Sequence, residues 1–165
     1  MRLLPIGLVA GLGAALIATS GASQTPDSQL DPRSVSLLKQ GEAALAAGQY
    51  QAADDALETA LVVDPRNRAA FITLAKVAQK QRLFGQAIRY TNKALALEPN
   101  DLTALSVQGE VMVDMGAGPR ARQNLARVRQ LCGANACPQA TTLAAAIARG
   151  PAVAQKAIPA VPKKN

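Results

Sequence analysis

The sequence predicts an all-α solenoid of about three helix–turn–helix units that ends in a capping helix. The first observation is a repeated pattern, which starts at Ser34 and restarts at Arg68. The second is composition: 49% of the 165 residues are hydrophobic, yet the chain has only two Phe, two Tyr and no Trp. Its apolar content is mostly Ala, Leu and Val. Ala and Leu favour helices, whereas strands are rich in β-branched and aromatic residues.

Residues 1–23 predict a signal peptide. Arg2 supplies a positive start, an uncharged apolar stretch follows to Ala18, and small residues come next up to Ser23. The alternative is an uncleaved membrane anchor, although about 16 apolar residues fall short of the roughly 20 that a spanning helix needs. We therefore expect an exported, periplasmic protein, in which residues 24–33 form a polar linker.

The two regular units cover residues 34–67 and 68–101, and each predicts two antiparallel helices. In unit one we expect helices over Ser34–Ala47 and Tyr50–Val63, where Asp31-Pro32 would start the first and Asp64-Pro65 would end the second. In unit two the corresponding helices are Arg68–Gln81 and Phe84–Leu97. Residues that match between the two units are Ala44 and Ala78, Tyr50 and Phe84, Ala53 and Ala87, Ala60 and Ala94, Leu61 and Leu95, and Pro65 and Pro99.

This order of a small residue, an aromatic residue, Ala, Ala-Leu and acid-Pro resembles the tetratricopeptide repeat (TPR). The resemblance implies a right-handed superhelix of paired helices that serves as a protein-binding surface. A degenerate third unit, residues 102–133, predicts helices over Leu102–Met115 and Pro119–Leu131. In this unit Gly118 replaces the aromatic residue and Cys132-Gly133 replaces acid-Pro. Terminal repeats are commonly atypical, so we expect the unit to lead into a cap.

Residues 138–149 predict the capping helix, which has proline at its start and arginine at its end. In an oxidising compartment Cys132 and Cys137 predict a structural disulfide that ties this cap to the last repeat. The alternatives are a redox pair, for which the spacing is too long, and a metal site, which lacks further ligands because the chain has no histidine. Residues 150–165, with three prolines and three lysines, predict a disordered tail.

The predicted partner surface is the concave groove that TPR proteins build from the first helix of each unit. Leu38 and Glu42 stand where a TPR carboxylate clamp would have Lys and Asn, so the resemblance implies that this clamp is absent. By resemblance the groove residues are Leu38, Glu42, Leu45, Ile72, Lys76, Gln79, Ser106, Glu110 and Val113. The alternative is that any one of these side chains is ordinary solvent-facing surface.

Charge is distributed unevenly along the chain. Residues 23–114 contain nine basic and eleven acidic residues, whereas residues 115–165 contain eight basic residues and no acid. The expected last repeat helix carries arginines on both sides of an apolar row. They either flank a buried stripe with their heads in water or form a basic dock for an acidic protein or an anionic lipid. These arginines are Arg120, Arg122, Arg127 and Arg129.

Without histidine the common nucleophile–base pairs and metal triads are absent, and we expect no enzyme activity, no cofactor and no small-molecule substrate. The sequence therefore predicts a non-catalytic scaffold or adaptor of the bacterial cell envelope, with another envelope protein as its partner. The alternative is a peripheral binder of anionic membranes or envelope polymers that acts through the cationic C-terminal face. Nucleic acid is the weakest candidate partner, because export separates the chain from it and the tail lacks aromatic residues for base stacking.

Overall fold

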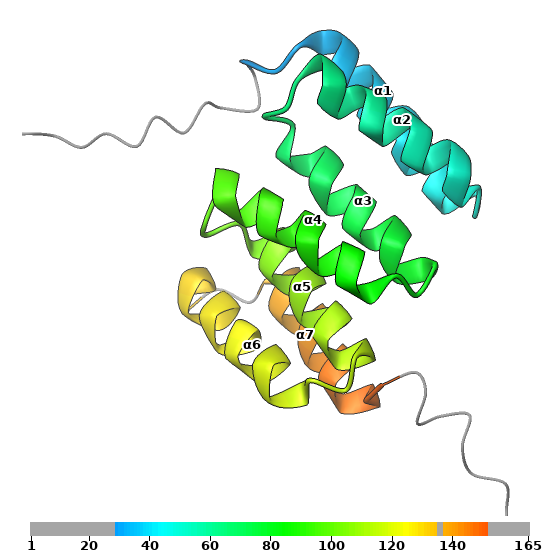
Figure 1. The fold of residues 1–165 in the computed structure, drawn as a ribbon. Helices are drawn as coiled ribbons and strands as arrows, with labels where there is room; N and C mark the ends of the chain where they lie inside the picture. Colours follow the sequence, from blue (N-terminus) through cyan, green and yellow to red (C-terminus); the bar gives the residue numbers. More distant parts are fainter. Residues whose placement is uncertain (1–28, 135–136, 152–165) are drawn as a thin grey trace, which may run out of the picture.

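The computed structural model describes residues 29–134 and 137–151, and in these ranges the chain is all-α (Figure 1). The predicted signal peptide and most of the predicted tail lie outside the described residues. Every helix begins and ends close to its predicted position. The helices are α1 (Pro32–Ala46), α2 (Tyr50–Val63), α3 (Arg68–Lys80), α4 (Phe84–Leu97), α5 (Leu102–Asp114), α6 (Gly118–Cys132) and α7 (Pro138–Arg149).

Polar side chains start the first helix of each unit. Asp31 accepts a hydrogen bond from the backbone N–H of Arg33 at the start of α1, and Asp101 accepts one from Ala104 at the start of α5. Asn67 does the same for Ala70 at the start of α3. The second helices α2, α4 and α6 have no side-chain cap and begin directly after a tight turn. These short turns keep the two helices of each unit antiparallel and close.

The helices stack in chain order (Figure 1). The pairs α1–α2, α3–α4 and α5–α6 form three hairpins, while α3 contacts both helices of the first hairpin and α5 both helices of the second. Helix α7 contacts α5 and α6 in the same way, so it takes the place of the first helix of a fourth unit. The predicted disulfide is present and joins Cys132, the last residue of α6, to Cys137, the N-cap of α7. Such a short loop contributes about 2 kcal/mol in the chain-entropy model.

Small residues allow the helices to approach closely. The repeated alanines Ala53, Ala60, Ala87 and Ala94 have no exposed surface, and the aromatic rings that precede them pack against the same clusters. In α5 a methyl group on Gly109 would lie only 2.7 Å from both Cδ atoms of Leu143, which is fully buried. Glycine at this position therefore opens the socket in which the cap helix docks.

A buried polar network joins the first three helices. The Asn67 side chain is fully buried, and its Nδ2 donates to the Ser34 Oγ at 2.8 Å. The Ser34 hydroxyl in turn donates to the backbone oxygen of Ala60 at 2.8 Å. With Oδ1 capping α3, Asn67 links the starts of α1 and α3 to the end of α2.

Candidate functional site

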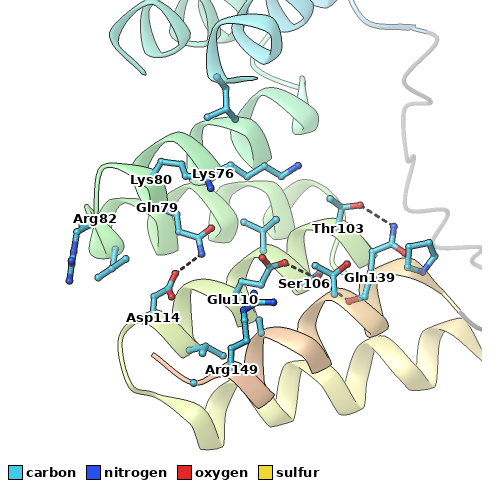
Figure 2. Close-up of a pocket in the computed structure, with 18 residues that line it drawn as sticks. Lys76, Gln79, Lys80, Arg82, Thr103, Ser106, Glu110, Asp114, Gln139 and Arg149 are labelled. Carbon is cyan, nitrogen blue, oxygen red and sulfur yellow. Dashed lines mark hydrogen bonds between the residues drawn. The ribbon is translucent and has the colours of Figure 1, made fainter. Parts of the chain in front are cut away.

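An open groove of about 760 Å³ lies between α3, α5 and α7 (Figure 2). Its apolar lining comes from Val107 and Val113 of α5 and Ala146 of α7, with Leu45 and Phe84 at the ends of their helices. The polar and charged lining residues surround this surface. They are Lys76, Gln79, Lys80, Arg82, Thr103, Ser106, Glu110, Asp114, Gln139, Thr142 and Arg149.

Hydrogen bonds join the three helices that form the groove. The Gln79 amide of α3 donates to the Asp114 carboxylate at the end of α5 at 2.6 Å. On the other side, Ser106 Oγ of α5 lies 3.1 Å from the backbone oxygen of Gln139 in α7 and 3.3 Å from Glu110 Oε1. Helix α5 is thus the floor, and polar contacts fix α3 and α7 on either side of it. The groove is a preformed surface rather than a gap between loosely packed helices.

Glu110 lies in the middle of the groove, next to Ser106 and Arg149 (Figure 2). Burial raises the pKa of its carboxyl group, and this effect outweighs the opposing effects of the Ser106 hydrogen bond and the positive charges of Lys76 and Arg149. The charged form of Glu110 is therefore less favourable in the folded chain than in water.

We expect Glu110→Gln to raise stability at neutral pH. The raised pKa means that the folded chain holds this proton more tightly than the unfolded chain, so the contribution of Glu110 to stability falls as pH rises through the interval between the two pKa values. The advantage of the glutamine variant should appear above that interval and vanish below about pH 4. Urea unfolding midpoints of the wild type and of Glu110→Gln, determined at neutral pH and below about pH 4, measure this advantage. Glu42→Gln makes the same change of residue type at the equivalent position of unit one, where the glutamate is exposed outside the groove, and serves as the control.

The groove contains six of the nine side chains expected from the sequence: Leu45, Lys76, Gln79, Ser106, Glu110 and Val113. Three others lie elsewhere. Ile72 is only 6% exposed and belongs to the core, Leu38 packs against the core cluster of the first unit, and Glu42 is exposed outside the groove. None of the groove residues expected from the sequence belongs to α7, which forms a complete wall through residues such as Thr142 and Arg149. The periodicity of the repeats carries no information about a helix that follows them.

The arginines of α6 lie outside the groove. Arg120, Arg122 and Arg129 are exposed. Of the apolar row expected between the arginines, Ala121, Leu125 and Val128 are buried, whereas Leu131, near the end of the helix, is 39% exposed. The remaining arginine, Arg127, donates to the backbone oxygen of Pro99 at 2.9 Å and to Asn100 Oδ1 at 3.2 Å. It thereby ties α6 to the loop between α4 and α5.

Across residues 29–134 and 137–151, no three His, Cys, Asp or Glu side chains are placed to hold a metal ion. In the same ranges, no helix is both long and apolar enough to cross a bilayer. The two cysteines of the chain are joined in the disulfide.

The chain has the fold of TPR domains. The first TPR of Spaghetti (RPAP3), bound to the HSP90 peptide SRMEEVD, matches 73% of this chain and 94% of its own at 23% identity, with a TM-score of 0.63. The Sgt2 TPR domain from Aspergillus fumigatus matches 82% and 89% at 20% identity and a TM-score of 0.65. The yeast Sti1 TPR2B domain, in a pHsp70 complex, matches 76% and 99% at 16% identity and a TM-score of 0.66. The sequence matches no protein-family model and no curated protein.

Proposed function

We propose that this chain is a non-catalytic scaffold or adaptor of the bacterial cell envelope, and that it holds a peptide or helix of another envelope protein in the α3–α5–α7 groove. The observation that carries the proposal is the groove itself. It is preformed, it is open along one side of three stacked helices, and its lining combines apolar and polar side chains. A surface of this kind suits an extended segment whose apolar side chains are buried and whose backbone is hydrogen-bonded.

The structural neighbours support a protein partner, because the RPAP3 domains are bound to HSP90 or HSP70 peptides and the Sti1 domain forms a complex with pHsp70. The positions at which TPR resemblance would put a carboxylate clamp lie outside this groove and carry Leu38 and Glu42 in place of Lys and Asn. In addition, α1 contributes only Leu45 to the lining, so the groove is displaced toward the C-terminal end of the stack. We therefore propose an internal segment as the ligand rather than a free C-terminus.

The cellular location rests on the sequence and on one covalent bond. Residues 1–23 have the charge pattern and the small-residue cleavage site of a signal peptide. The Cys132–Cys137 disulfide fits an oxidising compartment, where such bonds persist. Both observations support export to the periplasm.

The experiment that tests the groove compares the same substitution at two adjacent positions of α7. Thr142 lines the groove, whereas Thr141 is exposed outside it, about 100° away around the helix. Thr142→Arg places a long charged side chain in the groove and should weaken partner binding at least tenfold. Thr141→Arg adds the same bulk and charge outside the groove and should leave partner binding within about twofold of wild type.

The partner is first trapped with a photo-crosslinking residue at Thr103, a partly exposed position in the groove lining, and is then purified for titration against both variants. If purified partner binds both variants equally well, the groove is not the binding site and the proposal fails. The melting temperatures of the two variants are also compared, and equal values exclude a folding defect as the cause of a difference in partner binding.

A further inference from the structure

The second helices of the three units, α2, α4 and α6, differ in the sign of their charge. Helix α2 carries three acidic residues and no basic one, whereas α4 carries two basic residues, α6 carries four, and neither has an acid. The sign changes at equivalent repeat positions: exposed Asp55 of α2 corresponds to exposed Arg89 of α4, one repeat later. We call the cations of α4 and α6 the basic outer surface. It consists of Arg89, Lys93, Arg120, Arg122, Arg127 and Arg129.

These cations are exposed, and no described carboxylate neutralises any of them. Within the described residues, only Arg127 of this set has a side-chain hydrogen bond, and both of its acceptors are uncharged oxygens. None of the six forms an ion pair with a described carboxylate. Protein surfaces usually mix both signs, which limits repulsion between like charges. A set of like charges on two helices is therefore available to an anionic partner.

The basic outer surface is separate from the groove. Among the described residues that line the groove, α6 supplies none, and α4 supplies only Phe84 at its first position. The groove is built by α3, α5 and α7. One partner can therefore occupy the groove while another contacts the outer helices.

We propose that the basic outer surface docks the protein on an anionic phospholipid bilayer. Five of the six cations are arginines, whose planar guanidinium group pairs with two phosphate oxygens at once, as a lysine cannot. Lipid headgroups move laterally and can match the spacing of the arginines, whereas an acidic protein would need a complementary rigid surface. Leu97 and Leu131, which are 41% and 39% exposed at the ends of α4 and α6, add apolar contacts at the interface.

Vesicle sedimentation tests the proposal. The chain from Gln24 to Asn165 contains all described residues, and it is mixed with vesicles of phosphatidylglycerol and phosphatidylcholine or of phosphatidylcholine alone. Binding should need the anionic lipid and weaken steeply with salt. A basic residue near an anionic surface contributes about fivefold, so Arg89→Gln with Arg122→Gln should reduce the partition coefficient about 25-fold.

The matched control removes two charges at the other end of the stack. Arg33→Gln with Lys39→Gln changes exposed side chains of α1 and should reduce binding by less than about threefold. An equal loss in both double variants would mean that net charge alone drives binding, which overturns the proposal. A chain that ends at Gly150 and no longer binds would assign the lipid contact to the tail. Capture of an acidic polypeptide such as polyglutamate, with no vesicle binding, would assign the surface to a protein partner instead.

Discussion

Replacing Leu143 by alanine is expected to lower the free energy of unfolding by about 2–5 kcal/mol, a large part of the roughly 5–15 kcal/mol typical of a whole domain. The Leu143 side chain is fully buried and fills the socket above Gly109. It is the main apolar anchor of α7, so amide hydrogens of α7 should also exchange faster in the variant. Leu97→Ala, the same change at a leucine that is 41% exposed, should cost about 1 kcal/mol or less. Equal losses of unfolding free energy at the two positions would show that Leu143 does not fill a buried socket.

A double-mutant cycle identifies the socket directly. Gly109→Ala alone gains up to about 1 kcal/mol of helix propensity but forces its methyl group against Leu143, and overpacking of this kind costs about 1–3 kcal/mol. In the Leu143→Ala background that clash is absent, so Gly109→Ala should become stabilising. Urea unfolding of the four proteins measures the coupling, and additive effects would show that the two residues do not share a site.

Asn67→Ala should cost about 2–4 kcal/mol through polar contacts rather than through a cavity. The substitution removes the cap of α3 and the donor to the Ser34 hydroxyl, both of which are buried. Since this network joins α1, α2 and α3, the whole N-terminal half of the stack should melt earlier. Thermal unfolding monitored by circular dichroism measures the effect.

Ser34→Ala separates the two contributions of Asn67. It leaves the cap of α3 in place but removes the hydroxyl between Asn67 and the backbone oxygen of Ala60. We expect a cost of about 1–3 kcal/mol for Ser34→Ala and little further loss when it is added to Asn67→Ala. If the two losses simply add, Ser34 and Asn67 stabilise the fold independently and the network does not act as a unit.

The helices could be predicted from the sequence because the repeat specifies both where helices cross and where they end. A small residue such as Ala53 or Ala87 is needed wherever two helices cross, and a proline or turn residue is needed wherever a helix ends. These requirements recur in each repeat, so each unit supports the interpretation of the other. The third unit, with altered residues at several of these positions, still folds as a hairpin because its buried face keeps the helical spacing.

The groove could be predicted only in part. The repeat pattern places Lys76 and Glu110 correctly because corresponding positions of α3 and α5 face the same side of the stack. Ile72 occupies a corresponding position too, but the tight packing of α3 between its neighbours buries it in the core. The contribution of α7 depends on how the cap docks, and this is set by the contact between Gly109 and Leu143, residues that belong to different elements. Periodicity does not reveal a contact between a repeat and a segment outside it.

Charge counted along the chain also concealed a pattern that the fold makes visible. Division of the sequence at Met115 gives a nearly neutral front and a cationic back. The structure groups the residues differently, because α4 belongs to the front by sequence but packs against α5, in the unit that contains the basic helix α6. Its cations Arg89 and Lys93 are balanced in the count by acids on α2 that belong to another unit.

The separation of acidic α2 from basic α4 and α6 makes the molecule an electric dipole along the axis of the stack. A charged partner that approaches from solution exerts a torque on such a dipole before any contact forms. The protein therefore turns its C-terminal units toward negative charge during the encounter, and productive collisions become more frequent. Salt should act mainly on the rate of association, since contacts that are already formed lie within the screening length of about 8 Å at physiological ionic strength. The order of the repeats thus determines how fast the molecule associates with a charged partner, and in which orientation.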